Sequence, residues 1–103
     1  MNLNKASEKA FEIAQKRNQY KFDDRDVARG LKHCAGEVIE ACEAHNNWTF
    51  LGTILDTDLK QAFEDELADV IMCILSICGF EHIDIEKAIE RCFEKNEKRV
   101  VQK

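Results

Sequence analysis

AGEVIEACEA at residues 35–44 and EDELADVIMCIL at residues 64–75 are the two stretches that decide how this chain folds. Each contains two acids spaced three residues apart among apolar residues. These acids are Glu37 and Glu40 in the first stretch and Glu66 and Asp69 in the second. Residues three apart lie on the same face of an α-helix, because each residue turns the helix by about 100°. Both stretches therefore predict a helix that carries a pair of carboxylates near its buried face.

The composition of the chain favours a single all-α domain. Its 103 residues are enough for one domain, which we place at residues 1–103, and 45% of them are hydrophobic, which is enough for a core. The chain has no Pro and only four Gly, and runs of β-branched residues are sparse. These features indicate helices rather than strands.

Four helices are expected from the spacing of the apolar residues. They run about from Leu3 to Tyr20, from Val27 to Ala44, from Leu59 to Cys78, and from the residue after Asp84 towards Val100. Asp26 and Asp58 are candidate N-caps, and Gly79 is a candidate stop for the third helix. The connection at residues 45–58 contains Gly52 and two Asn residues, which interrupt the helical pattern. Four helices with short connections predict a four-helix bundle.

Charge and cysteine content exclude several classes of partner. The net charge of −5 argues against binding a nucleic acid polymer, which requires an excess of Lys and Arg. The longest apolar stretch, Val70 to Cys78, is too short to span a membrane, and residues 1–9 do not resemble a signal peptide. The five Cys include no C-x-x-C pair and are expected to be reduced. We therefore expect a cytoplasmic protein.

The two acidic pairs occupy equivalent places on their helices. If Val38 and Leu67 are the centres of the buried stripes, each pair falls on the same flank of its stripe, so packing of the two stripes lets the pairs converge. Like charges at this spacing cost a helix about 0.2–0.5 kcal/mol per pair, and more near a core. A hard divalent cation such as Mg²⁺ removes that cost. The alternative interpretation is that the acids are solvated edges of two amphipathic helices.

The order of the acids also resembles a known family. Glu37-Val38-Ile39-Glu40 followed by Glu66-Leu67-Ala68-Asp69 is similar to the E-x-x-E…E-x-x-D signature of the MazG-like all-α nucleoside triphosphate pyrophosphohydrolases. LKHCAGEVIEACEA, EDELADVIMCIL and FEKNEKRV resemble the second, third and last helices of that family. The resemblance covers about residues 25–100. The chain departs from many members in having HCAG where they carry further acids before the first pair.

The resemblance implies a fold, a reaction and a site. The fold is the four-helix MazG fold, and the reaction is the Mg²⁺-dependent (or Mn²⁺-dependent) hydrolysis of an NTP or dNTP to the monophosphate and pyrophosphate. The residues that bind the metal or orient the attacking water are then Glu37, Glu40, Glu66 and Asp69. A non-catalytic, dimeric helical interaction protein, whose acids only decorate the surface, is the alternative.

Five further residues are candidates for binding the nucleotide. They are Lys32, Trp48, Lys95, Asn96 and Arg99. The last three resemble the basic stretch of the family's last helix, where they imply phosphate contacts; cations near a helix C-terminus are also favourable in themselves. Lys32 can reach a phosphate or pair with an acid. Trp48 can stack on a base or close the end of the bundle.

The second half of the third helix predicts an oligomer. After Asp69, apolar residues surround the helix on all sides, as in a helix that is buried all round. A small bundle rarely buries one helix so completely, so we expect a subunit interface there and a homodimer or homotetramer. On the fourth helix, the residues expected to face inward are Ile85, Ile89, Cys92, Phe93 and Val100.

Overall fold

The computed structural model describes residues 2–51 and 57–101, and these residues are almost entirely helical. The helices are α1 (Leu3–Lys16), α2 (Asp26–Asn46), α3 (Thr57–Phe80) and α4 (Ile85–Val101), and a π-helical turn, η1 (Asn47–Leu51), follows α2. The described residues contain no strand, so the all-α prediction is confirmed. α1 ends earlier than Tyr20, and the helical path of α2 continues through η1 into the connection that the sequence predicts to be irregular.

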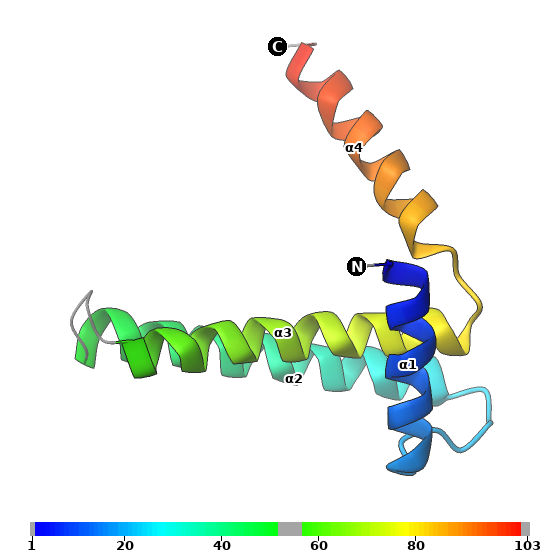
Figure 1. Cartoon of the computed structure of the whole chain (residues 1–103), viewed down its shortest axis with the longest axis horizontal. Coiled ribbons are helices and arrows are strands. Elements are labelled where there is room, and N and C mark those ends of the chain that lie inside the picture. Colours follow the sequence, from blue (N-terminus) through cyan, green and yellow to red (C-terminus); the bar gives the residue numbers. More distant parts are fainter. Residues whose placement is uncertain (1, 52–56, 102–103) are drawn as a thin grey trace.

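The helices form a long hairpin with a third helix across one end (Figure 1). α2 and α3 lie side by side and run in opposite directions. α1 crosses this hairpin where α2 begins and α3 ends, while α4 leads away from the hairpin. Among the described helices, none is long and apolar enough to cross a membrane.

α2 and α3 pack along a seam that recurs every three or four residues. The seam residues are Gly30, Cys34, Glu37, Ala41 and Ala44 on α2, and Leu59, Phe63, Glu66, Val70, Cys73 and Ile77 on α3. All of them are buried or half-buried, as expected for two antiparallel helices that pack along their length. Several α2 seam residues are small, which lets the two helices approach closely.

The seam is rotated by one residue from its predicted position. The sequence predicts Val38 and Leu67 at its centre, but these side chains are 45% and 43% exposed. The preceding residues, Glu37 and Glu66, occupy the seam instead. The prediction that all four acids flank the seam is therefore wrong for these two, although Glu40 is exposed at its edge. Apolar periodicity selects Val38 and Leu67 because acids are not expected in the face that packs against a neighbouring helix.

The crossing of α1 and α3 depends on close contact at Gly79. A Cβ atom at this position would lie 2.7 Å from the Cβ of Phe11 and even closer to the backbone of Ser7. Beside the crossing, the ring of Tyr20 packs 4.6 Å from that of Phe80, and its hydroxyl lies 2.7 Å from Ser76 Oγ. The residues of α3 that become buried at the crossing are Leu75, Ser76, Ile77 and Cys78.

Gly79 is therefore a packing residue and not the predicted helix stop. α3 continues past Cys78 to Phe80. Just beyond the end of α3, His82 has a left-handed φ of 55°, and the N–H of Ile83 donates to the carbonyl of Cys78 at 2.9 Å. These are the features of a Schellman motif.

Asp26 fixes the loop that joins α1 to α2. The sequence predicts it as an N-cap, but it is the first residue of α2, and its buried carboxylate accepts the backbone N–H groups of Lys21 and Asp23 at 3.0 and 3.2 Å. The Arg29 guanidinium donates to it as well. Burial opposes ionisation of Asp26, but these hydrogen bonds outweigh it and lower the pKa of the carboxyl.

α4 is joined to the other helices mainly at its beginning. Asn4 Nδ2 donates to Asp84 Oδ1 at 3.0 Å, Asn4 Oδ1 accepts the N–H of Ile85 at 3.1 Å, and the N–H of Asn4 donates to Glu86 at 3.3 Å. Further along α4, three of the residues that the sequence predicts to face inward are exposed in this chain; they are Cys92, Phe93 and Val100. α4 thus does not complete a bundle with the hairpin within the described chain.

The second half of α3 is partly buried within the chain. The sequence predicts that this half is buried on all sides and forms a subunit interface. α1 and α2 bury Leu75, Ile77 and Cys78. Ile71, Met72 and Ile74 are exposed in the single chain, and the subunit interface stays a prediction.

We expect Gly79→Ala to destabilise the fold and Gly36→Ala to stabilise it. At Gly79 an added methyl group collides with the α1 backbone, and such overpacking costs about 1–3 kcal/mol. At Gly36, also within a helix, a Cβ would meet no atom within 4 Å, so the substitution should gain about 0.4–1 kcal/mol through helix propensity. Urea unfolding followed by circular dichroism measures both. Equal stabilities of the two variants would contradict the close crossing of α1 and α3.

Candidate active site

Three carboxylates meet where the middle of α2 faces the middle of α3. Each of these residues offers one carboxylate oxygen, and the three oxygens lie within 4.8 Å of one another; the residues are Glu37, Glu40 and Glu66. Glu37 and Glu66 are held in the seam by the packing of the two helices, and Glu40 approaches from the next turn of α2. The antiparallel hairpin therefore brings the two acidic stretches together, as the matched spacing of the acids predicts.

Two oxygens of this cluster are buried without a hydrogen-bond partner among the described residues. They are Glu37 Oε2 and Glu66 Oε2. The Glu37 side chain is only 15% exposed, and its other oxygen lies 3.4 Å from His33 Nε2. A buried, unpaired polar atom is costly, and more so when it carries charge. Among the described residues, Glu37 Oε2 and Glu66 Oε2 therefore lack a partner, and a bound cation would supply one to each.

The pKa values of Glu37 and Glu66 are raised by burial and by the like charges of neighbouring acids. Burial raises the pKa of Glu37, and the negative charge of Glu40 raises it further. Burial also raises the pKa of Glu66, with added contributions from Glu40 and Asp69. Each acid thus disfavours ionisation of its neighbours, which is the behaviour of carboxylates gathered without a counterion.

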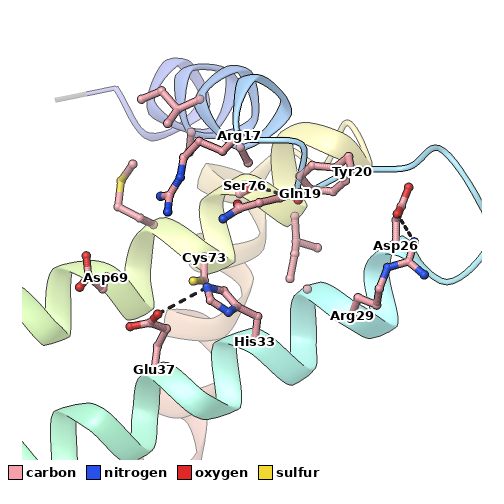
Figure 2. A pocket seen from close by; sticks show the side chains of 16 residues that line it. Arg17, Gln19, Tyr20, Asp26, Arg29, His33, Glu37, Asp69, Cys73 and Ser76 are labelled. Atoms are coloured by element: carbon pink, nitrogen blue, oxygen red, sulfur yellow. Dashed lines mark hydrogen bonds and ion pairs between the residues drawn. The ribbon is translucent and has the colours of Figure 1, made fainter.

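Asp69 lies beside the cluster rather than within it. Its side chain is exposed on α3 and is not one of the three convergent carboxylates, although its charge acts on both Glu37 and Glu66. Figure 2 shows Asp69 and Glu37 on opposite helices at the edge of one cavity.

This cavity, of about 470 Å³, lies between α1 and the hairpin. Its polar lining includes Arg17, Gln19, Arg29, His33, Cys73 and Ser76. Arg17 and Gln19, which follow α1, direct their polar ends into the cavity (Figure 2). Burial and the charge of Glu37 raise the pKa of Cys73 to about 11, so this group is a thiol at neutral pH and is unsuited to act as a nucleophile.

Arg17 and Gln19 are not among the residues that the sequence singles out. Both follow the last apolar residues of the first helix, where a basic residue is usually explained by the helix dipole. Only the crossing of α1 over the hairpin brings them near the acids, and the sequence carries no local signal for that crossing.

The predicted nucleotide-binding residues are dispersed. Lys32 lines a second hollow of about 400 Å³ together with Glu37 and Glu40. Trp48 lies in η1 at the far end of the hairpin, with its ring stacked 6.0 Å from that of Phe63. It therefore packs against that end of the hairpin.

Lys95, Asn96 and Arg99 are exposed on α4 and lie away from the acids within this chain. None of the three lines either cavity. Their predicted contact with phosphate has no counterpart in the arrangement of the single chain.

A family model for the MazG nucleotide pyrophosphohydrolase domain matches residues 22–102. The chain belongs to this family. The resemblance inferred from the two acidic pairs is thereby confirmed. No curated protein and no solved structure matches the chain at a significant level. The matched part of this MazG domain begins after α1, although α1 forms one wall of the cavity.

The carboxylate cluster suits a hard divalent cation. Mg²⁺ and Mn²⁺ prefer oxygen ligands, and the cluster offers carboxylate oxygens from three residues, two of which carry an oxygen that the described residues leave unpaired. In this MazG domain the residues that would hold the ion are Glu37, Glu40 and Glu66, with Asp69 beside them.

We expect Glu66→Gln to stabilise the metal-free MazG domain at pH 7 and to make it insensitive to Mg²⁺. The substitution removes a charge that burial and three neighbouring acids disfavour, so the melting temperature should rise. In the unchanged protein, millimolar Mg²⁺ should raise the melting temperature by mass action, and Glu66→Gln should remove most of that rise.

The stability of the metal-free folded protein should depend on pH through Glu66. Because the pKa of Glu66 is higher in the folded state than the unfolded value of about 4.3, the folded protein holds this proton more tightly. The metal-free protein should therefore gain stability as the pH falls from 7 towards about 5, and Glu66→Gln should weaken that gain. Asp65→Asn, which changes the exposed acid next to Glu66, is the matched control. A lower melting temperature and an undiminished response to Mg²⁺ in Glu66→Gln would contradict a metal site here.

Proposed function

We propose that this protein hydrolyses a nucleoside or deoxynucleoside triphosphate to the monophosphate and pyrophosphate in a reaction that depends on Mg²⁺ or Mn²⁺. Membership of the MazG family supports the class of reaction. The observation that carries the proposal is the meeting of Glu37, Glu40 and Glu66, two of which have a buried oxygen without a partner among the described residues. Glu37 also lines the cavity, together with Asp69. A bound divalent ion would supply positive charge to the triphosphate and activate water there.

The cavity between α1 and the hairpin is the proposed place for the nucleoside part of the substrate. Its volume of about 470 Å³ lies within the range of small-molecule sites, about 300–1,000 Å³. Arg17 directs its guanidinium into this cavity from the α1 side, so it can pair with a phosphate oxygen. Gln19 and Ser76 offer hydrogen bonds to a base or sugar.

The acids perform the chemistry on the α-phosphorus. A water oxygen forms a bond to the α-phosphorus, the bond from this phosphorus to the bridging oxygen of pyrophosphate breaks, and a carboxylate accepts the proton of the water. Asp69 is exposed towards the cavity and can orient this water, while Glu37 and Glu66 are fixed in the seam. Holding these groups on two packed helices preorganises them for the reaction.

We expect monophosphate and pyrophosphate in equal amounts from a panel of nucleoside triphosphates. Asp69→Asn and Glu66→Gln should each lose about 100-fold or more of the rate, because a positioned acid or base contributes about 10²–10⁴-fold. Both variants should keep the circular dichroism spectrum of the unchanged protein, and Asp65→Asn should keep its rate.

The position of attack is tested in ¹⁸O-labelled water. Attack on the α-phosphorus places the label in the monophosphate. Label in the pyrophosphate would show attack on the β-phosphorus, and a diphosphate product would contradict the proposed reaction itself. Absence of turnover over the whole panel with Mg²⁺ and Mn²⁺ would favour the non-catalytic interaction protein.

We also propose that the chain works as a homodimer or homotetramer. Large apolar side chains are exposed on the outer faces of the hairpin and on α4; they include Val38, Ile39, Leu67, Ile71, Ile74 and Phe93. Such surfaces are characteristic of interfaces. If α4 of one copy covers the hairpin of another, Lys95, Asn96 and Arg99 approach the acids of that copy and can bind phosphate.

We expect light scattering to report at least a dimer at micromolar concentration. Phe93→Asp and Ile71→Asp place a charge on side chains that are 64% and 54% exposed in the single chain, so each should weaken assembly without disturbing the folding of that chain. Gln61→Asp introduces the same charge at an exposed polar position of α3 and should leave assembly unchanged. A stable species of 11.9 kDa would contradict the proposal.

A further inference from the structure

A second group of potential metal ligands lies next to the carboxylate cluster. His33, Glu37 and Cys73 each offer one ligand atom, and these three atoms lie within 4.8 Å of one another. His33 and Glu37 are one turn apart on α2, and Cys73 faces them from the seam of α3. Figure 2 shows the three side chains converging on the wall of the cavity.

The three donors differ in kind from those of the carboxylate cluster. An imidazole nitrogen, a sulfur and a carboxylate oxygen are the ligands of Zn²⁺, whereas Mg²⁺ prefers oxygen alone. Ligand distances of about 2.0–2.3 Å in tetrahedral zinc sites place neighbouring ligand atoms about 3.3–3.8 Å apart. The distance of 3.4 Å from His33 Nε2 to Glu37 Oε1 already matches that spacing.

The surroundings permit a cation at this place. Arg29 lines the same cavity, but its guanidinium is paired with Asp23 and Asp26, so its charge is largely compensated. Glu37 keeps a buried oxygen without a partner among the described residues. The His33 side chain is 56% exposed, so an ion can enter from solvent and water can complete the coordination.

We propose that His33, Glu37 and Cys73 form a Zn²⁺ site that shares Glu37 with the carboxylate cluster. Binding exchanges the thiol proton of Cys73, which passes to solvent, for a sulfur–zinc bond. Because both ions would use the Glu37 carboxylate and carry charges of the same sign, zinc and Mg²⁺ oppose each other's binding. A zinc ion bound to these residues would also lie in the wall of the cavity between α1 and the hairpin. Zinc binding itself does not depend on the proposed hydrolysis, and only the competition with Mg²⁺ rests on the carboxylate cluster holding that ion.

The site is tested with Co²⁺ as a spectroscopic probe of the full chain without nucleotide. We expect one equivalent per chain to give a thiolate-to-cobalt charge-transfer band, and added Zn²⁺ to abolish it. Cys73→Ser should lose the band. His33→Ala, at an exposed position, should weaken Zn²⁺ binding by more than about 10-fold, since even outer-shell partners of metal ligands are worth about 10–100-fold in affinity.

Matched controls identify the thiol and the imidazole. Cys34→Ser, Cys92→Ser and His82→Ala should each keep the band and the affinity of the unchanged protein. Absence of the band, its persistence in Cys73→Ser, or its loss in a control variant would overturn the site.

Competition tests the shared ligand. Millimolar Mg²⁺ should weaken Zn²⁺ binding to the unchanged protein but not to Glu66→Gln, which retains all three zinc ligands. If Mg²⁺ binds the unchanged protein yet leaves its zinc affinity unaltered, the sharing of Glu37 is wrong. If Mg²⁺ does not bind at all, the carboxylate site of the proposed function fails, while the Co²⁺ spectrum still decides the zinc site.

Discussion

The main constraint on this fold is that two carboxylates occupy positions where a pair of packed helices normally places apolar side chains. Glu37 and Glu66 lie in the seam between α2 and α3, and each has an oxygen left unpaired by the described residues. Apolar residues at these two positions would strengthen the hairpin, because burying uncompensated charge is expensive. Burial of these acids destabilises the hairpin. The close packing of the other seam residues and the crossing of α1 must therefore compensate for this cost.

Features whose signal lies within one helix or in a pair of matching helices are predictable from the sequence. The spacing of the acids predicts that α2 and α3 bring them together, and the same residues carry the family resemblance. Periodicity places Val38 and Leu67 in the packed face because they are more hydrophobic than Glu37 and Glu66, which lie in the seam instead. Packing between two helices depends on small residues and close approach as much as on hydrophobicity.

Features created by contacts between distant segments were not predictable in this way. The sequence predicts that Gly79 ends a helix, because glycine is common at helix ends. Its role in packing depends on the close contact with α1, which lies far away in the sequence. Arg17 and Gln19 reach the cavity because α1 crosses the hairpin, and both residues lie before the part of the chain that the family model matches. Asp26 likewise holds the preceding loop through contacts that its N-cap pattern does not specify.

Because α4 is attached through Asn4 near its first residues, a small rotation at this attachment would displace the far end of the helix by a larger distance. α4 has 17 residues, which corresponds to a length of about 25 Å at 1.5 Å per residue. A rotation of about 10° at its base would therefore displace its far end by about 4 Å, more than the length of a hydrogen bond. The three hydrogen bonds of Asn4 thus contribute to the placement of the basic residues on α4. A small change in the first turn of α1 would displace those charges further than it displaces Asn4 itself.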